Sequence, residues 1–391
     1  MKILLIHTFY QLKGGEDFVF EQEFDLLKKN NEVKSVVLNN KKGVKGAIQF
    51  VSSIWNIKIA SQIKSEIIQF QPDVVHVHNL HFAASPIVLR TIKKMHIPIV
   101  VTLHNYRLLC PSATLLHNRE VYNVSLKSVF PWQAVKDKVY RNSYFQTFWL
   151  AFINWTHRRI NTWDKVDKYI VLTDFAKELV TKSSLNIDSS KLVIKPNFTR
   201  ETIICLDTNV QKEGFLFVGR LSQEKGIECL LKAFSHNNYC LEIGGDGPLQ
   251  KDVLELANAN IKVNYRGNLS KKEVVYYMEK AQILISPSIC YEGMPMTIIE
   301  AFSVGTPVIA SNLGAMSSMI TDGYNGFLFN AGDYEDLNTK LDLWNSLSTE
   351  EKQIMSQNAY NTYLENYTPD KNRELLMNIY QQAIERNKAK K

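Results

Sequence analysis

The chain has 391 residues, of which 45% are hydrophobic, and a formal net charge of +7 at pH 7. This composition excludes a disordered or fibrous protein, and the length is sufficient for two domains with cores of their own. The positive charge favours anionic partners such as nucleotide phosphates or lipid head groups, and no basic repeat or recognised motif points to nucleic acid.

Neither a membrane span nor a signal peptide is expected. The longest strongly apolar stretches, such as "FWLAFINW" at 148–155, are shorter than the ~20 residues that cross a bilayer, and the chain opens directly as a strand. The five cysteines are widely spaced and contain no C-x-x-C pair, which argues against disulfides and zinc. We therefore expect reduced thiols and a cytoplasmic protein, with peripheral contact to the inner face of the membrane left open.

Predicted strands and helices alternate along the chain in two blocks. The first block has a helix at 18–30 and strands at 2–10, 73–79, 98–105 and 168–174. The second block has helices between strands at 214–219, 240–245, 262–267, 282–288 and 307–311. This alternation predicts an α/β protein of two doubly wound, Rossmann-like domains facing across a cleft. The periodicity lapses around Pro196, within 195–214, which separates a domain at 1–198 from one at 199–369.

The stretch "YEGMPMTIIEAFSVGTPVIAS" at 291–311 follows an apolar run that ends in turn residues. Such a run is typical of a strand buried on both faces, and ligands bind at the carboxyl ends of these strands. Pro295 suits the first position of a helix that stops at Gly305. The unpaired N–H groups of its first turn form an anion site, and Gly293 allows a diphosphate to approach the backbone.

Two glutamates accompany this predicted anion site. Glu292 lies in the turn before the helix and Glu300 lies within the helix, so the two carboxylates stand at different heights and cannot share a proton. Carboxylates are good acceptors for sugar hydroxyls. We therefore expect a nucleotide sugar, with Glu300 binding the ribose and Glu292 the transferable sugar. The alternative, a solvated turn residue and a helix-surface charge, stays open.

The stretch "FLFVGRLSQEKG" places two cations after a strand, Arg220 and Lys225. Arg220 can grip phosphate oxygens with two hydrogen bonds, and Lys225 can add a mobile charge, although both could be ordinary loop charges. In "CLEIGGDGPLQ", Gly245 and its neighbouring glycines permit a tight turn beside a ligand, or form a turn only. The spacing is not G-x-G-x-x-G, which weakens an interpretation as an NAD site.

Three histidines at 76, 78 and 81 could suggest a metal site. His76 and His78 point to one face of a strand, and the surrounding sequence offers no carboxylate or cysteine to join them. Structural or acceptor-contact roles are therefore expected. Since the chain also lacks a D-x-D motif, we expect no metal or other cofactor. Cationic side chains and a helix dipole would stabilise negative charge instead.

These motifs resemble the family 4 glycosyltransferases, which have the two-domain GT-B fold. The resemblance covers nearly the whole chain and is strongest between Phe215 and Phe329, through "GRLSQEKG", "GGDGP", "EGMPMTIIEAFSVGTPVIAS" and "DGYNGFLF". It implies that residues 1–198 bind the acceptor, that 199–369 bind the nucleotide-sugar donor, and that a C-terminal helix at 370–391 packs back on the first domain. It also implies transfer with retention of anomeric configuration.

The resemblance extends to the N-terminal block. The loop with Gly14 and Gly15 looks like a glycine loop whose amides face the donor, although a plain turn is the alternative. The acceptor side is expected to include His78, Asn79, His104 and Asn105. The expected catalytic residues are His104, which would lie near the transferred sugar, with Arg220, Lys225 and Glu292. The expected donor site comprises Gly14, Gly15, Arg220, Lys225, Gly245, Glu292, Gly293, Met294, Pro295 and Glu300.

The expected function is sugar transfer from a nucleotide diphosphate donor, with a UDP-sugar favoured, to a glycan or polyprenyl-linked glycan. The product would be a bacterial surface polysaccharide such as an O-antigen, a capsule or an exopolysaccharide. Alternatives are a GT-B-type nucleotide-sugar epimerase or hydrolase, and a non-catalytic nucleotide-sugar-binding subunit. Residues 120–165 mix Trp, Phe and Tyr with Lys and Arg, which suits either contact with an anionic membrane or a helical insert packed on its own domain.

Overall fold

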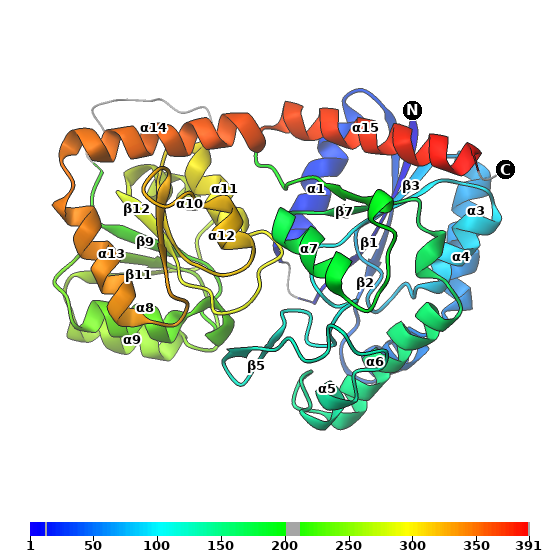
Figure 1. The fold of residues 1–391 in the computed structure, drawn as a ribbon, viewed down its shortest axis with the longest axis horizontal. Coiled ribbons are helices and arrows are strands. Elements are labelled where there is room, and N and C mark those ends of the chain that lie inside the picture. Colours follow the sequence, from blue (N-terminus) through cyan, green and yellow to red (C-terminus); the bar gives the residue numbers. More distant parts are fainter. Residues whose placement is uncertain (12–13, 201–211, 390–391) are drawn as a thin grey trace. The chain divides into compact units, whose positions relative to one another are not determined.

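The computed structural model describes residues 1–11, 14–200 and 212–389. The chain divides into two compact units (Figure 1). One unit comprises Met1–Leu115, Tyr122–Pro196 and Asn372–Lys391, and the other comprises Leu116–Val121 and Asn197–Lys371. The segment predicted to separate the domains, 195–214, lies in part outside the described residues.

The N-terminal unit is built on a six-stranded parallel sheet in the order β2-β1-β3-β4-β7-β8. Its strands are β1 (Lys2–Phe9), β2 (Glu32–Asn39), β3 (Val74–Val77), β4 (Ile99–Thr102), β7 (Lys168–Val171) and β8 (Leu192–Ile194). Strands β3 and β4 are buried along their whole length, as expected of strands covered on both faces. The strand order reverses between β1 and β3, which pair parallel, and doubly wound sheets bind ligands at such a reversal.

Helices lie on both sides of this sheet (Figure 1). They are α1 (Gly15–Lys28), α2 (Gly43–Ser52), α3 (Ile57–Phe70), α4 (Ile87–Lys94), α5 (Trp132–Lys136), α6 (Tyr144–Arg159) and α7 (Asp174–Lys182), with 3-10 turns at Trp163–Lys165 and Ser189–Lys191. The hairpin strands β5 (Leu116–His117) and β6 (Glu120–Val121) pair antiparallel. From Asn372 onward, α15 (Pro369–Lys388) packs on this unit, since Tyr380 Oη lies 2.8 Å from His76 Nδ1 and Asn372 Nδ2 donates to Pro196 O at 2.8 Å.

The C-terminal unit contains a second six-stranded parallel sheet in the order β11-β10-β9-β12-β13-β14. Its strands are β9 (Phe215–Val218), β10 (Leu241–Gly244), β11 (Val263–Gly267), β12 (Ile283–Ser286), β13 (Val308–Ser311) and β14 (Gly326–Phe329). Its helices are α8 (Ile227–Ser235), α9 (Gln250–Ala259), α10 (Lys271–Lys280), α11 (Met296–Ser303), α12 (Ala315–Met319), α13 (Tyr334–Ser346) and α14 (Thr349–Asn366), with a 3-10 turn at Gln223–Lys225. Phe215, Phe217, Ile285 and Trp344 belong to its core.

The prediction of two Rossmann-like domains with parallel sheets is confirmed. Cys110, Cys229, Cys240 and Cys290 are free thiols, and Cys205 lies outside the described residues. Among the described helices, none combines the length and the apolar character that a bilayer span requires.

Candidate functional site

Strands β9 and β12 are parallel neighbours at the centre of the C-terminal sheet, where Leu216 pairs with Leu284. The strand order reverses between them, and in doubly wound sheets ligands bind beside the carboxyl ends of such a pair. The segment after β9 carries Arg220 and Lys225, and the segment after β12 carries Glu292 and then α11 with Glu300. The topology therefore brings Arg220, Lys225, Glu292 and Glu300, called here the donor-site group, to one edge of one sheet.

Lys225 and Glu292 are in direct contact. Lys225 Nζ lies 2.6 Å from Glu292 Oε1, and Ser288 Oγ donates to the same oxygen at 2.7 Å. The two loops are also joined by their backbones, because Ile289 N donates to Glu224 O at 3.0 Å. Burial would lower the pKa of Lys225, but the Glu292 carboxylate, together with Cys290 and Glu224, raises the pKa above its usual value. Lys225 therefore remains a cation at neutral pH.

Arg220 is exposed at the end of β9. Its guanidinium forms no ion pair or hydrogen bond with any other described residue. The loop that carries it is fixed to the neighbouring loop, since Leu221 N donates to Asp246 O at 2.9 Å. The site thus offers a second cation whose hydrogen-bond donors are available to an anionic ligand.

Helix α11 begins at Met296, one residue later than predicted, and Pro295 is its N-cap with extended backbone angles. No side chain caps the helix, and Ile298 N donates to Pro295 O at 3.3 Å, so the N–H groups of Met296 and Thr297 in its first turn remain available to an anion. Gly293 is half-buried in the preceding turn, whereas the Met294 side chain is buried and contacts Asn197 N through its sulfur at 3.2 Å. Gly305 follows the helix with φ of 63°, as expected of a helix stop.

Glu300 is half-buried on α11. Burial raises the pKa of Glu300 to about 7, and the Lys271 ammonium lowers it only in part. Within the described ranges its carboxyl has no hydrogen-bond or ion-pair partner. Partly desolvated acceptors without partners are unfavourable in the free protein and can be satisfied by ligand hydroxyls.

Gly245 holds the neighbouring loops close together rather than offering an open surface. Its φ is 143°, and a Cβ added there would stand 1.8 Å from Gly219 O. Its N–H donates to Gly267 O at 2.7 Å. The backbones at Gly245 and Gly219 lie too close together for a side chain, so the fold of the site requires a glycine at this position.

Gly245→Ala is therefore expected to lower the free energy of unfolding by about 2 kcal/mol or more, since backbone strain and a steric clash add together. Urea unfolding followed by circular dichroism measures this. Gly323→Ala is the matched control, because Gly323 has φ of 76° but open space around its Cβ position; strain alone should cost about 1 kcal/mol there. Equal losses in the two variants would contradict the close-approach account.

A second group forms in the N-terminal unit, where β3 and β4 end side by side. His78 follows β3 and His104 follows β4, and His78 Nδ1 lies 3.0 Å from His104 Nε2 with the two ring planes inclined by 19°. The asparagine after each histidine reaches Glu16, since Asn79 Nδ2 donates to Oε1 at 2.9 Å and Asn105 Nδ2 to Oε2 at 3.2 Å. The four predicted acceptor-side residues thus form two contacting pairs, with the histidines bonded to each other and the asparagines sharing the Glu16 carboxyl group.

Glu16 is a candidate functional residue that the sequence analysis did not identify. It stands in the first turn of α1, after the β1 strand at the reversal point of the sheet. Burial raises the pKa of Glu16 to about 7, against the hydrogen bonds from Tyr10 and Asn105, which lower it. A glutamate directly after a glycine pair that follows the first strand is the signal that could have identified it.

The glycine loop is partly described, because residues 12–13 lie outside the described ranges. Gly14 is the N-cap of α1, and its N–H donates to Asp17 Oδ2 at 2.8 Å. Asp17 Oδ1 is in turn 2.7 Å from His7 Nε2. The Gly14 amide, predicted to face the donor, therefore has an acceptor within its own helix, and Gly15 is exposed as the first residue of α1.

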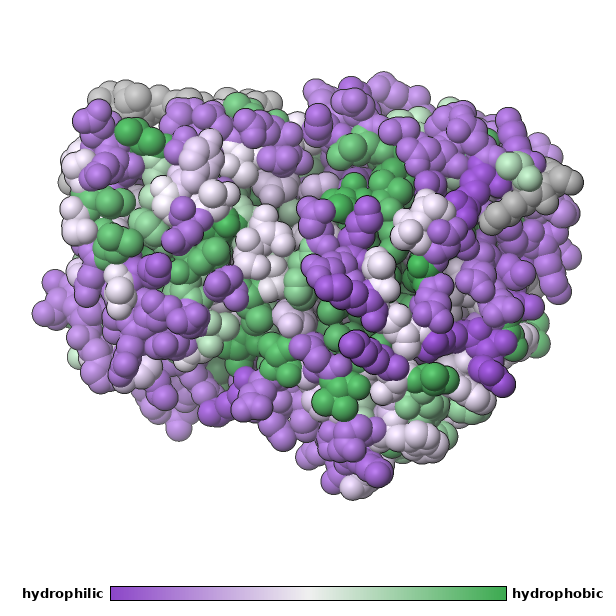
Figure 2. Space-filling view, viewed as in Figure 1, coloured by the Kyte–Doolittle hydropathy of each residue, from purple (hydrophilic) through white to green (hydrophobic). Residues whose placement is uncertain are grey.

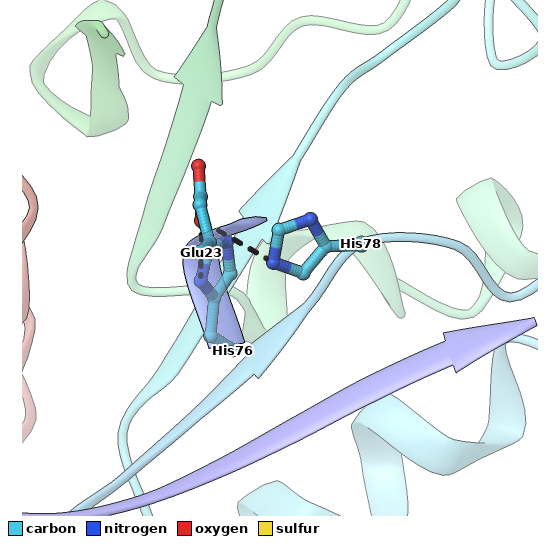
Figure 3. Close-up of side chains that lie close together, drawn as sticks. All are labelled: Glu23, His76 and His78. Carbon is cyan, nitrogen blue, oxygen red and sulfur yellow. Dashed lines mark ion pairs between the residues drawn. The ribbon is translucent and has the colours of Figure 1, made fainter. Parts of the chain in front are cut away.

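Glu23, His76 and His78 place three ligating atoms within 4.8 Å of one another, all buried (Figure 3). The prediction that no carboxylate accompanies these histidines is therefore wrong: Glu23 comes from α1, distant in sequence but packed under β3. Lys195 Nζ lies 2.5 Å from Glu23 Oε1. Both ring nitrogens of His76 are also used, at 2.8 Å from Tyr380 Oη and 2.8 Å from Thr102 Oγ1. We interpret the cluster as a polar network in which an ammonium group already balances the carboxylate.

Two family profiles match the chain. Residues 28–200 match the family described as Glycosyltransferase Family 4. Residues 204–362 match the family described as Glycosyl transferases group 1. The donor-site group lies within the second match, and the two histidine-asparagine segments lie within the first.

An individual protein and two solved structures are also similar to most of this chain. An uncharacterized glycosyltransferase of Methanocaldococcus jannaschii is 26% identical over 357 residues, which cover 87% of each chain. The structure of a lipopolysaccharide outer core galactosyltransferase in its apo form matches with a TM-score of 0.65 and 18% identity, over 97% of this chain and 99% of that one. An Anabaena protein solved in complex with UDP and glucose matches with a TM-score of 0.66 and 15% identity, over 97% and 98%. At these identities the two structures show a shared fold.

Proposed function

Because the chain belongs to the family 4-like glycosyltransferases of the GT-B fold and is a transferase, we propose that it moves a sugar from a nucleotide diphosphate to a glycan or lipid-linked glycan, with retention of configuration. The observation that carries this proposal is the contact between Lys225 and Glu292 at the strand-order reversal. It places a cation for phosphate and an acceptor for hydroxyls at adjacent positions, as a nucleotide sugar requires.

The proposed donor binds along the edge formed by β9, β12 and α11. Arg220, Lys225 and the first-turn amides of α11 bind the diphosphate, since all are hydrogen-bond donors and the helix N-terminus adds positive potential. Glu300 accepts the ribose hydroxyls, and Glu292 accepts hydroxyls of the transferred sugar. On binding, the ion pair of Glu292 and Lys225 is exchanged for contacts of each side chain with the ligand.

The proposed chemistry follows from where charge develops. Cleavage between the anomeric carbon and the diphosphate leaves an oxocarbenium-like sugar and negative charge on the departing phosphate. Arg220 and Lys225 stabilise that charge, so we propose a reaction that needs no metal ion. Attack by the acceptor hydroxyl on the face that the diphosphate leaves gives retention, and the leaving phosphate takes the hydroxyl proton.

The acceptor side is proposed to lie at the ends of β3 and β4, with His104 nearest the transferred sugar. Burial lowers the pKa of His104 to about 3, so this imidazole is neutral and can exchange a hydrogen bond with a hydroxyl. Gly293, Met294 and Pro295 complete the proposed donor site of the C-terminal unit by shaping its turn, and Gly14 and Gly15 are the proposed donor-contact residues of the N-terminal unit.

A UDP-sugar and a surface polysaccharide are the favoured substrate classes. A structure of the same fold was solved with UDP and glucose, and another is a lipopolysaccharide outer core galactosyltransferase. We propose by analogy that this chain extends an O-antigen, capsule or exopolysaccharide.

Thermal stabilisation of the purified protein by UDP-, GDP- and ADP-sugars, followed by product analysis, tests the proposal. One class of donor should stabilise the protein, and nucleotide release should depend on an added glycan acceptor. Release of nucleotide, or epimerisation of the donor, at the same rate without acceptor would contradict transfer to a glycan.

We also propose that the N-terminal unit contacts an anionic membrane surface. Helix α2 has no buried residue, and Val44 and Ile48 are 78% and 64% exposed beside the exposed Lys41 and Lys42.

Helix α6 packs next to α2, since Trp149 Nε1 donates to Phe50 O at 3.0 Å. The surface around α5 and α6 mixes hydrophobic and hydrophilic residues in Figure 2, and Trp132, Tyr144 and Phe145 are each more than half exposed. Exposed apolar side chains bordered by lysines suit an interfacial helix.

The variant with Val44→Ser and Ile48→Ser is expected to partition about tenfold or more weakly to phosphatidylglycerol vesicles, because the apolar side chains no longer enter the interface. Co-sedimentation measures the partitioning. Ile261→Ser is the control, since Ile261 is 94% exposed in the other unit and its loss should have no effect. Failure of the unmodified protein to bind these vesicles at low salt would contradict membrane contact.

A further inference from the structure

Glu23 and Lys195 form an ion pair that the proposed reaction does not use. Glu23 lies on α1 and Lys195 follows β8, and both side chains are completely buried. Burial alone would raise the pKa of Glu23, but the Lys195 ammonium beside it holds the pKa below its usual value. The carboxylate is therefore ionised. Buried ion pairs are often no more stabilising than apolar side chains of the same size, so stability alone does not account for this pair.

The second oxygen of Glu23 faces His78. Glu23 Oε2 lies 3.5 Å from His78 Nε2 and 3.9 Å from His76 Nδ1 (Figure 3), and neither Oε2 nor His78 Nε2 forms a hydrogen bond within the part of the chain that the structure describes. An ionised carboxylate can only accept. The favoured state of a neutral His78 therefore carries its proton on Nε2, directed at Glu23.

The tautomer of His78 determines which ring nitrogen of His104 carries the proton. With its proton on Nε2, His78 carries a lone pair on Nδ1, and that atom lies 3.0 Å from His104 Nε2. The contact is a hydrogen bond only if His104 donates from Nε2. Burial lowers the pKa of both histidines, so each is neutral and carries one proton. His104 Nδ1 is then unprotonated.

We propose that Glu23 is a positioning residue that acts through His78 to hold His104 in the Nε2–H tautomer, so that Nδ1 accepts a hydrogen bond from a substrate hydroxyl. The proposal rests on the proposed function, which places His104 beside the transferred sugar. We call Glu23, His78 and His104 the relay. Lys195 maintains the charge on Glu23, and Asp17 takes no part in the relay because it is bonded to His7 instead. The arrangement follows the general pattern in which the partner of one ring nitrogen determines what the other presents.

The test replaces the ion pair by apolar side chains, Glu23→Leu with Lys195→Met, so that no buried charge is left unpaired. A second variant, His78→Phe, interrupts the relay at its middle and leaves the ion pair in place. Nitrogen-15 NMR of the histidine rings reports which nitrogen of His104 carries the proton, and steady-state kinetics separates kcat from KM. Tyr380→Phe is the control, because it removes a buried hydrogen bond to His76 without touching the relay.

In the unmodified protein His104 should carry its proton on Nε2. Both relay variants should lose this single tautomer and show kcat lower by about tenfold or more, the value of one lost hydrogen bond, with donor KM nearly unchanged. Tyr380→Phe should keep the tautomer and kcat even if it is less stable.

A proton on Nδ1 of His104 in the unmodified protein, or an unchanged tautomer in both relay variants, would overturn the proposal. A changed tautomer with unchanged kcat would overturn its catalytic part. The NMR measurement needs no substrate, so it decides the relay even if no nucleotide sugar supports turnover, which would be a failure of the proposed function alone.

Discussion

Replacing Arg220 by methionine is expected to lower kcat about a hundredfold, because removal of one group that stabilises developing negative charge costs ~3 kcal/mol of the barrier. Folding stability should not change, since the Arg220 side chain is exposed and forms no ion pair with the described residues. Lys225→Met should show a similar loss of turnover. In that variant the half-buried Glu292 also loses its cation, so stability should fall as well. Steady-state kinetics with a saturating donor, together with urea unfolding, measures both quantities.

The control for charge removal is Lys251→Met on α9, because Lys251 is 87% exposed in the same unit and lies on a helix surface. It should retain full activity. If Arg220→Met and Lys225→Met both kept the kcat of this control, the assignment of these two cations to the departing phosphate would be wrong.

Glu300→Gln is expected to weaken donor binding about a hundredfold, because each hydrogen bond from a ribose hydroxyl to a carboxylate is worth about 1.5–3 kcal/mol. The pH dependence follows from the pKa of Glu300, which is about 7 in the free protein. If only the ionised form binds donor, affinity for a UDP-sugar should fall roughly tenfold from pH 8 to pH 6. The variant should show no such dependence. Isothermal titration calorimetry at both pH values measures this.

The same substitution should stabilise the free protein above neutral pH. The pKa of Glu300 is raised on folding, from 4.5 to about 7, so its contribution to stability is fully present below the unfolded value and is lost as the pH rises through the folded value. At pH 8 the ionised carboxyl is a net cost, and Glu300→Gln should raise the free energy of unfolding by about 2 kcal/mol. If Glu300→Gln and the unmodified protein bound the donor with equal affinity at pH 8, the assignment of Glu300 to the donor site would be wrong.

Most of the central strands can be recognised from the sequence because they are buried on both faces and read as apolar runs, as in β3 and β12. Strand β2 cannot be recognised in this way, since it lies at the edge of its sheet and only Val36 and Leu38 are buried. Helix α2 escapes prediction for a related reason, because none of its residues is buried. Edge and surface elements do not carry the hydrophobic pattern from which a prediction starts.

The donor-site group can be predicted because its residues follow strand ends directly, and parallel strands bring those ends to one edge. The partnership between Lys225 and Glu292 cannot, since the residues are separated by 67 positions and their contact depends on β9 and β12 being neighbours. Glu23 was missed for the same reason: it comes from α1 and meets His78 only when that helix packs on β3. Sequence spacing identifies chemistry within a segment, whereas contacts between segments need the strand order.

A crystal structure with a bound nucleotide sugar tests the central claim most directly. We expect diphosphate oxygens within hydrogen-bond distance of Arg220, Lys225 and the Met296 and Thr297 amides of α11, with the ribose hydroxyls on Glu300. A nucleotide bound elsewhere, with the Lys225–Glu292 ion pair intact and Glu300 without a ligand contact, would contradict it.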